Sequence, residues 1–279
     1  MSTIRSIQDT HGIVGRADEL ASLLACVAAG RNVLLEGPVG VGKTELAKAV
    51  AAHLGRGLHR VDGDGRYSES RLVGLFDPPT VLERGYQPDA FQAGPLIRAM
   101  REGGVLLLNE LNRMPEGVQN VLLPALDEGI VQVPHLGEVR ATEGFCVIAT
   151  QNPAEFVATG DLSEALMDRF ELVRLDYQSG PEELGIVQAR TRCSPSQDTM
   201  IRAVELVRAT RSDPRVRRGA SVRAAVAIAD IATQLEGDLA KAAALALPTR
   251  IELLDERGTE LDALLADLKK KVLSGQPSR

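Results

Sequence analysis

The chain has 279 residues, enough for one large domain with a smaller one appended, and its 44% hydrophobic and 25% charged residues are ordinary for a soluble globular protein. The net charge of −6 and the pI near 5.4 lack the basic excess that nucleic-acid-binding domains usually carry. No apolar run approaches the roughly 20 residues that span a bilayer, and the three cysteines and four histidines show no metal-ligand spacing, so we expect a cytoplasmic protein with neither a membrane span nor a zinc site.

The first part of the chain alternates helices with strands. The apolar spacing over residues 17–28 predicts an amphipathic helix, and residues 32–36 predict a short buried strand that enters a glycine-rich loop. Residues 45–54 are predicted to be helical from their Ala and Leu content, and residues 58–61 to form a second strand. Three further strands are predicted at residues 105–108, 146–150 and 171–175.

Strands separated by helical stretches imply an α/β fold, in which helices cover both faces of a parallel sheet. Ligands in such folds bind at the carboxyl ends of the strands. Polar motifs directly follow the strands at residues 32–36, 105–108 and 146–150. We therefore expect these three motifs to meet in one crevice.

The pattern changes at Ser179-Gly180-Pro181, a group that interrupts regular structure and precedes a stretch with helical spacing throughout. We expect a second, all-helical domain to begin there. Its helices are predicted at residues 182–191, 198–211, 221–235, 239–247 and 260–272, and the tail of residues 274–279 is predicted to be disordered.

The glycine-rich loop has the form G-x-x-x-x-G-K-[ST]. In such a loop backbone N–H groups surround phosphate oxygens, the lysine reaches the terminal phosphates, and the hydroxyl binds Mg²⁺. The helix that starts here adds its positive end to the anion site. The sequence thus predicts a site for a nucleoside triphosphate, ATP with Mg²⁺. The predicted binding positions are Gly37, Pro38, Val39, Gly40, Val41, Gly42, Lys43, Thr44 and Glu45.

A hydrophobic strand that ends in two polar residues, Asn109 and Glu110, has the form of a Walker B strand, which lies beside the magnesium site. Glu110 is either the base that polarises the attacking water or a surface acid at a strand end. Asn109 is unusual, because this position normally carries an Asp that orients the water shell of Mg²⁺. We predict Thr44 as a magnesium ligand and Asn109 as a contact through water. The amide brings no negative charge, so metal affinity is expected to suffer more than the chemistry.

A third polar motif, Ala149-Thr150-Gln151-Asn152-Pro153, lies at the end of the strand at residues 146–150 and places Asn152 just after it. The Asn152 amide could hydrogen-bond the terminal phosphate or the attacking water, and phosphoryl transfer depends on such positioning. An Asn-Pro pair by itself commonly marks a turn. Its place after a core strand favours the functional interpretation.

The motifs, taken in order along the chain, resemble those of MoxR-type AAA+ ATPases, and the resemblance covers nearly the whole chain. They are the phosphate loop, Leu-Asn-Glu-Leu-Asn-Arg at 108–113, Ala-Thr-Gln-Asn-Pro at 149–153, Ala-Leu-Met-Asp-Arg-Phe at 165–170 and Gly-Ala-Ser-Val-Arg-Ala at 219–224. The run Phe-Gln-Ala-Gly-Pro-Leu at 91–96 is similar to the Gly-Pro-Leu element that precedes the Walker B strand in this family.

The resemblance implies roles for further residues. Asn152 would be sensor 1, and Arg169 would be the arginine finger that reaches the nucleotide of a neighbouring subunit, where a planar cation offsets developing charge. Without the resemblance, Arg169 would be expected to pair with Asp168 or another local acid. Arg223 would be the sensor 2 residue that ties a helical lid to the nucleotide of its own subunit. Val14-Gly15-Arg16 is similar to the segment that lines the adenine pocket.

The resemblance also implies an architecture. An AAA+ P-loop core with a five-stranded parallel sheet would occupy residues 1–179, and an all-helical lid would occupy residues 180–279. A helix 2 insertion is expected at about residues 73–92, and a pre-sensor-1 hairpin, turning at Leu136-Gly137, at about residues 129–142. The two segments either contact a partner or are simply exposed loops.

MoxR-type proteins form rings, so we expect the chain to self-associate, by analogy as a hexamer. The resemblance also implies that the protein hydrolyses ATP and remodels other proteins in a chaperone-like way. The resemblance implies a von Willebrand factor A domain protein and a client enzyme as partners. Two alternatives stay open: a nucleotide-gated binding module with weak or no turnover because of Asn109, and a nucleic-acid-stimulated AAA+ motor. The basic cluster at residues 208–218 is predicted to be a solvated turn, and the acidic balance argues against nucleic acid as a partner.

Overall fold

The computed structural model of the protein describes residues 2–152, 162–254 and 258–273. Contacts between residues divide the chain into two compact units. The first unit holds residues 1–11, 16–38 and 42–176, and the second holds residues 12–15, 39–41 and 177–279. The tail predicted to be disordered, residues 274–279, lies outside the described residues.

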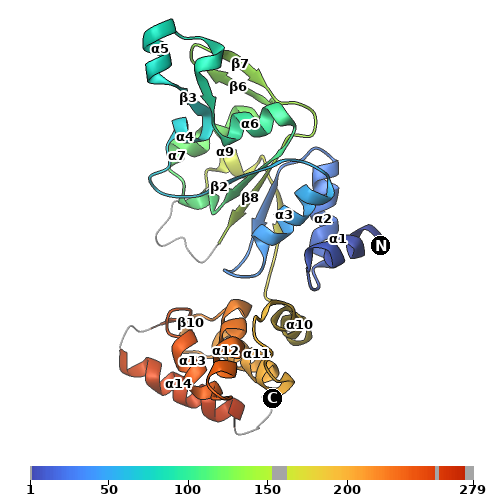
Figure 1. The fold of residues 1–279 in the computed structure, drawn as a ribbon, viewed down its shortest axis with the longest axis vertical. Coiled ribbons are helices and arrows are strands. Elements are labelled where there is room, and N and C mark those ends of the chain that lie inside the picture. Colours follow the sequence, from blue (N-terminus) through green and yellow to red (C-terminus); the bar gives the residue numbers. More distant parts are fainter. Residues whose placement is uncertain (1, 153–161, 255–257, 274–279) are drawn as a thin grey trace. The chain divides into compact units, whose positions relative to one another are not determined.

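A five-stranded parallel sheet forms the centre of the first unit, as predicted (Figure 1). In space its strands run in the order β2-β5-β8-β1-β9. Because β8 lies between β1 and β5, the carboxyl ends of the three strands that carry the predicted motifs are neighbours at one edge of the sheet. The strands are β1 (Val33–Glu36), β2 (Leu58–Asp62), β5 (Val105–Asn109), β8 (Cys146–Gln151) and β9 (Glu171–Arg174).

Helices cover both faces of this sheet. Leu106, Leu107 and Leu108 of β5 alternate between the two faces, and all three side chains are fully buried. Helix α3 (Lys43–His53) contacts β2, β5 and β8, and α6 (Pro95–Glu102) contacts β2 and β5. Apart from the helices of the segment at residues 73–92, the other helices of the unit are α1 (Ser2–His11), α2 (Ala17–Ala28), α4 (Glu69–Val73), α7 (Glu116–Asn120), α8 (Leu122–Asp127), α9 (Glu164–Met167) and the 3-10 turn η2 (Leu111–Arg113).

Helix α1 is not predicted from the sequence, because its run STIRSIQDTH holds few apolar residues and gives a weak periodic signal. It contacts α2 and α3, and Ile7 is buried there. Tertiary packing, more than intrinsic propensity, therefore accounts for this helix. Within the described ranges no helix combines the length and the apolar character that crossing a bilayer requires.

The segment predicted as an insertion, residues 73–92, contains regular structure. Strand β3 (Gly74–Phe76) pairs antiparallel with β4 (Phe91–Ala93), and α5 (Pro78–Arg84) and the 3-10 turn η1 (Pro88–Ala90) lie between them in the chain. The Asp77 carboxylate caps α5 by accepting a hydrogen bond from the backbone N of Thr80 at 3.1 Å. The insertion is thus a small folded element instead of a loop.

The predicted hairpin is present, formed by β6 (Ile130–Val133) and β7 (Gly137–Arg140). Its turn covers residues 134–136, slightly before the predicted position, and His135 there has a φ of 62°. The ring of Tyr86 from the insertion stacks on His135, with centroids 3.8 Å apart and planes 11° apart. The Phe76 ring meets Tyr86 edge-on at 5.1 Å. These three rings, named here the aromatic contact, join the insertion to the hairpin.

The second unit is a helical bundle with an alanine-rich core. Ala224, Ala225, Ala229 and Ala232 of α12 are fully buried, and their small side chains let the neighbouring helices approach closely. A short antiparallel ribbon of β10 (Val216–Arg218) and β11 (Glu252–Leu253) accompanies the helices and is not predicted from the sequence. The helices are α10 (Gly180–Arg190), α11 (Gln197–Ser212), α12 (Val222–Gln234), α13 (Leu239–Ala246) and α14 (Gly258–Leu273).

The Ser179-Gly180-Pro181 group starts α10. Ser179 Oγ accepts a hydrogen bond from the backbone N of Glu182 at 3.4 Å, and Glu182 Oε2 accepts one from the backbone N of Ser179 at 3.0 Å. This reciprocal capping box satisfies two helix-end donors, and the proline fits the first turn. The helix therefore begins two residues before the predicted position 182.

The basic residues at 208–218 do not form the predicted solvated turn. The Arg211 side chain is 11% exposed and donates to Glu183 Oε1 at 2.7 Å, while Glu183 itself is 2% exposed. Arg215 forms a second ion pair with Asp213 at 2.9 Å. The prediction is wrong because residues 208–212 belong to α11 and residues 216–218 to β10, and because Glu183, distant in the sequence, draws Arg211 into a largely buried ion pair.

Candidate active site

The phosphate loop joins β1 to α3. Gly40 and Gly42 have φ angles of 82° and 96°, which residues with a side chain rarely adopt. A Cβ at Gly37 would lie 2.1 Å from the carbonyl oxygen of Leu175, so the base of the loop has no room for a side chain. Lys43, the first residue of α3, donates from Nζ to the Gly37 carbonyl at 2.6 Å. This contact holds the ammonium group against the loop.

Other predicted nucleotide-binding positions lie in the loop and in the first turn of α3. Val41 is 6% exposed, and Val39 and Val41 group with the second unit. Glu45 in the first turn of α3 forms an exposed ion pair with Lys48 at 3.0 Å. Contacts of these residues and of Pro38 with nucleotide stay predictions.

Side chains from α3, β2, β5 and β8 meet beside Lys43 in a hydrogen-bonded group centred on Asn109. The Oδ1 atom of Asn109 accepts hydrogen bonds from Thr44 Oγ1 at 2.9 Å and Thr150 Oγ1 at 3.0 Å. The Nδ2 atom donates to Asp62 Oδ1 at 2.9 Å. Two hydroxyl donors on one side and a carboxylate acceptor on the other fix the orientation of the amide. We call these four residues the Asn109 network.

Glu110 directly follows this network in an unusual backbone conformation. Its φ and ψ are 58° and 52°, a left-handed geometry that residues other than glycine rarely adopt and that is common at functional sites. Its backbone N donates to Thr150 Oγ1 at 2.9 Å, which stabilises the turn. Its Oε2 accepts a hydrogen bond from Arg113 at 2.6 Å. The carboxylate of the candidate base is therefore held at the strand end by an ion pair with Arg113.

Asp62 ends β2 opposite Asn109 in the pairing of β2 with β5. Burial alone would raise the pKa of Asp62. Hydrogen bonds from Arg60 and Asn109, together with the charges of Arg60 and Lys48, outweigh that effect, so its pKa lies below the ordinary value. The network therefore contains one carboxylate that is ionised at neutral pH.

Asn152 lies directly after β8 and is 3% exposed. The preceding residue, Gln151, donates from Nε2 to Glu36 Oε2 at 2.7 Å at the end of β1. Since β1 leads into the phosphate loop, Asn152 lies at the edge of the sheet from which that loop leaves. Its role as a sensor stays a prediction.

Arg169 lies just after α9 and pairs with a local acid. Its guanidinium contacts Asp127 Oδ2 at 2.6 Å and also donates to the carbonyl oxygen of Ala165. The hydrogen bond with Asp127, and then the charges of Asp127 and Asp168, raise the pKa of Arg169. Arg169 thus forms an ion pair within its own chain, with Asp127 of α8 and not with the neighbouring Asp168, and the finger role stays a prediction.

Val14 and Gly15 belong to the second unit and pack against the start of α10. Gln178 Nε2 donates to the carbonyl oxygen of Val14 at 2.7 Å. Gly15 has a φ of 65°, and a Cβ there would lie 2.0 Å from Glu182 Oε1. The segment is tightly fixed, while its contact with adenine stays a prediction.

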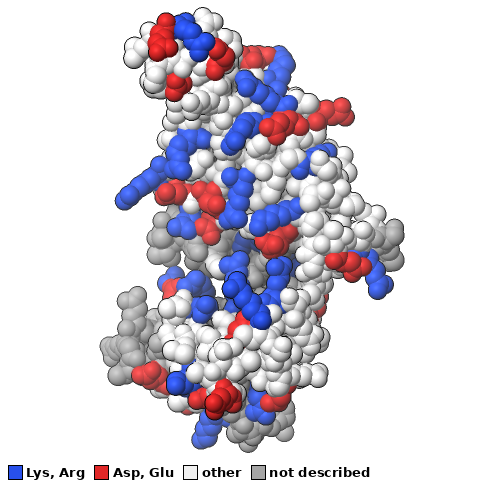
Figure 2. Space-filling view, in the orientation of Figure 1, with Lys and Arg blue, Asp and Glu red and all other residues white. Residues whose placement is uncertain are grey.

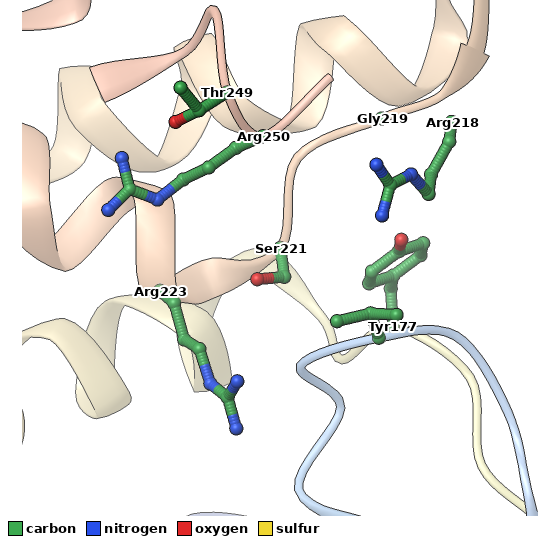
Figure 3. Close-up of a pocket in the computed structure, with 8 residues that line it drawn as sticks. Tyr177, Arg218, Gly219, Ser221, Arg223, Thr249 and Arg250 are labelled. Carbon is green, nitrogen blue, oxygen red and sulfur yellow. The ribbon is translucent and has the colours of Figure 1, made fainter. Parts of the chain in front are cut away.

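Arg223 lines a pocket of the second unit (Figure 3). It extends from the start of α12, and Arg218 and Arg250 reach the same pocket from other segments. Three arginines thus line one pocket, although Arg218 also pairs with Glu252 Oε2 at 3.5 Å, which offsets part of the positive charge. The remaining lining residues are Val39, Tyr177, Gly219, Ser221 and Thr249.

The chain is similar to proteins of a known family. Residues 32–170 match the model of the AAA domain, dynein-related subfamily. A protein of Staphylococcus saprophyticus is 31% identical, over 73% of this chain and 78% of that protein. The chain belongs to the AAA+ ATPases. YeaC of Bacillus subtilis is another relative of this AAA+ chain, 29% identical over 93% of the chain and 90% of YeaC.

Solved structures show the same AAA+ fold. A crystal structure of a candidate ATPase from Cytophaga hutchinsonii is 23% identical, with a TM-score of 0.55, over 97% of this chain and 94% of that one. NtrX from Brucella abortus, solved in complex with ADP, is 18% identical, with a TM-score of 0.58, over 94% of this chain and 61% of NtrX. Likeness at this level of identity is a likeness of fold, a parallel-sheet core followed by a helical region.

The AAA+ motifs led to Thr44, Asn109 and Glu110, and the structure brings these residues together. Asp62 and Thr150 were missed as site residues, although both belong to the Asn109 network. A signal for Asp62 was present, because it is a polar residue at a strand end, as Asn109 is. Thr150 lies within the third motif, but its partners on β5 follow only from the sheet order.

Proposed function

We propose that this AAA+ protein binds ATP with Mg²⁺ and hydrolyses it. The Asn109 network is the observation that carries the proposal. Through the 2.9 Å hydrogen bond between Thr44 and Asn109 it connects the helix that follows the phosphate loop to the strand end that carries Glu110. Groups suited to hold phosphates and a group suited to accept a proton thus lie at one edge of the sheet.

The residues of the network fit a hydrated magnesium ion. This ion prefers oxygen ligands and usually keeps several of its waters. Thr44 Oγ1 donates its proton to Asn109 and keeps lone pairs that could bind the metal, while Asn109 Oδ1 and the Asp62 carboxylate offer oxygen acceptors for its waters. When bound, Mg²⁺ would offset the negative charge of the β- and γ-phosphates.

The protein side chains would divide the remaining work. Lys43 and the backbone N–H groups at the start of α3 would bind the phosphates, since both offer positive charge there. Glu110, whose carboxylate pairs with Arg113, would take the proton of the attacking water. Asn152 would orient that water or the terminal phosphate.

The finer part of the proposal rests on the resemblance to MoxR-type proteins. The chain would assemble into a ring, expected to be a hexamer, and remodel partner proteins or metalloenzymes in a chaperone-like way. Arg169 would act on the nucleotide of the neighbouring subunit, and Arg223 and Val14-Gly15 on that of their own. A von Willebrand factor A domain protein and a client enzyme are the proposed partners.

Steady-state phosphate release in the presence of Mg²⁺ tests the hydrolysis proposal. Wild type should release phosphate on the order of 100-fold faster than Glu110→Gln, because the variant lacks a proton acceptor. Both should bind a fluorescent ATP analogue equally well, whereas Lys43→Ala should bind it more weakly. The hydrolysis proposal would be wrong if wild type were no faster than Glu110→Gln.

A second candidate is a binding module that holds ATP with little turnover. The uncharged Asn109 favours it, because a magnesium site with less negative charge holds the metal less tightly. In that case ATP would bind and change the conformation, as limited proteolysis would detect, while phosphate release stayed at the Glu110→Gln level.

The nucleic-acid-stimulated motor has less support. Figure 2 shows basic and acidic side chains interspersed over much of the face drawn, and the net charge is −6. Within the basic cluster, Arg211 and Arg215 are engaged in ion pairs. Turnover that rises with added DNA or RNA and falls with salt would support this function instead.

A further inference from the structure

The end of β2 is locked against the end of β5. Asp62 and Asn109 are paired positions in the parallel register, and the backbone N of Gly63 donates to the carbonyl oxygen of Asn109 at 2.7 Å. A Cβ at Gly63 would lie only 2.1 Å from the carbonyl oxygen of Glu110. The approach is therefore closer than any other residue at position 63 would permit, and it fixes where the Asp62 side chain begins.

Asp62 acts on one end of the Asn109 amide and Thr44 on the other. Asp62 Oδ1 accepts from Nδ2, which leaves Oδ1 of Asn109 facing the Thr44 and Thr150 hydroxyls. An amide rotated by 180° would set its oxygen against the carboxylate and its nitrogen against the two hydroxyls. The carboxylate therefore selects the orientation in which an oxygen atom faces Thr44.

We propose that Asp62 is a positioning residue of the magnesium site, which orients the Asn109 amide and supplies the negative charge that an aspartate in place of Asn109 would bring. The inference rests on the proposed binding of ATP with Mg²⁺. The negative charge that Asn109 lacks at the end of β5 would then come from Asp62 on the neighbouring strand β2. Asp62 lies one hydrogen bond further from Thr44 than Asn109 does.

A simpler role for Asp62 is to anchor Arg60. The guanidinium of Arg60 donates to the same Oδ1 atom, from Nε at 3.0 Å and from a terminal nitrogen at 2.6 Å. Arg60 and Asp62 side chains are 43% and 59% exposed, so their ion pair lies in contact with solvent. An anchoring role predicts equal consequences for removing either partner, whereas a magnesium role predicts that only the removal of Asp62 raises the Mg²⁺ requirement.

The test is a titration with Mg²⁺ of the binding of a fluorescent, non-hydrolysable ATP analogue. Asp62→Asn keeps an oxygen that can accept from Asn109 and removes only the charge. It should raise the Mg²⁺ concentration for half-maximal binding by about tenfold, the scale of losing one charge near a divalent ion, and leave binding in EDTA unchanged.

Arg60→Gln should lower or maintain the Mg²⁺ concentration for half-maximal binding. Asp64→Asn, whose exposed carboxylate accepts from the backbone N of Arg66, is the matched control and should behave like wild type.

The double variant Asp62→Asn/Asn109→Asp moves the carboxylate to the Walker B strand and keeps one amide and one acid in contact. It should restore the Mg²⁺ requirement toward wild type. An unchanged Mg²⁺ requirement in Asp62→Asn, or no recovery in the double variant, overturns the inference while leaving ATP binding intact. No binding of the analogue by wild type at any Mg²⁺ concentration overturns the proposed function and this inference with it.

Discussion

The hydroxyl group of Thr150 on β8 contacts both polar residues at the end of β5, Asn109 and Glu110. Thr150 is fully buried, and its Oγ1 donates to Asn109 and accepts from the backbone N of Glu110. The second contact stabilises Glu110 in its left-handed conformation, which costs about 1–3 kcal/mol in a residue with a side chain. A hydroxyl that is buried in this way affects both folding and the position of the candidate base.

Replacing Thr150 by Val should lower the free energy of unfolding by about 1–3 kcal/mol, because it leaves a backbone N–H without its acceptor at similar side-chain volume. Chemical denaturation checks this value. Phosphate release should fall more than binding of an ATP analogue, since Glu110 loses its support. Thr142→Val is the control, because the Thr142 hydroxyl is exposed where it donates to Arg101, and it should change stability little. Equal stability of the two variants would contradict the role given to Thr150.

Sequence motifs predict residues of this site where a pattern fixes both the residue type and the spacing. Thr44, Asn109 and Glu110 were found in that way. Asp62 and Thr150 contribute through partners on other strands, and those partners follow from the order β2-β5-β8, which the sequence does not specify. The conformation of Glu110 was also beyond prediction, since nothing about a glutamate indicates a φ of 58°.

Among the elements, the insertion and the hairpin form one surface through the aromatic contact. Tyr86 is 51% exposed although it stacks on His135, and Phe76 supports it from the side. The two segments are predicted independently as partner-binding candidates. Their contact means that a partner bound to one would also affect the other.

Tyr86→Ala should loosen both elements without unfolding the sheet. Loss of a ring pair costs about 0.5–1.5 kcal/mol, which corresponds to amide hydrogen exchange that is faster by a factor of about 2 to 13 in the insertion and in the hairpin. Leu82→Ala is the control, because Leu82 is 87% exposed on α5 and should leave hairpin exchange unchanged. Faster exchange in the insertion alone would indicate that the aromatic contact does not join the two elements.

Element prediction succeeded where the apolar signal was strong. Strands β5 and β8 are buried along almost their whole length and read clearly as core strands. Helix α1 and the ribbon of β10 and β11 were missed, because a helix with few apolar residues and strands of two or three residues carry almost no periodicity. Their stability comes from the surfaces against which they pack.

At the scale of the whole molecule, a variant of Arg169 can distinguish a ring from independent subunits, because an arginine finger would act on the nucleotide of the neighbouring subunit. Glu110→Gln and Arg169→Ala should each abolish most turnover while ATP still binds. In an equal mixture, about a quarter of the interfaces in a cyclic assembly would combine an intact Glu110 with an intact Arg169 from its neighbour. Phosphate release should therefore return on mixing, to about a quarter of the wild-type rate.

The ion pair of Arg169 with Asp127 supplies the control for that experiment. If Arg169 acts on a neighbour, Asp127→Asn should retain most turnover, because the arginine keeps its charge. If the arginine only stabilises its own subunit, both Asp127→Asn and Arg169→Ala should lower the melting temperature, and mixing with Glu110→Gln should restore nothing. Those results would remove the arginine finger from the proposal.

The strand order also determines which strands can pair first while the chain is being synthesised. Both strands that pair with β1, namely β8 and β9, lie far downstream of it, whereas β2 pairs with β5 in the first half of the chain. A nascent chain that has emerged only as far as β5 can close the β2-β5 pair, but β1 still lacks both of its neighbours. Pairings over such long separations form slowly. The strand that leads into the phosphate loop therefore joins the sheet late, and fragments that end before β8 should not acquire this site at all.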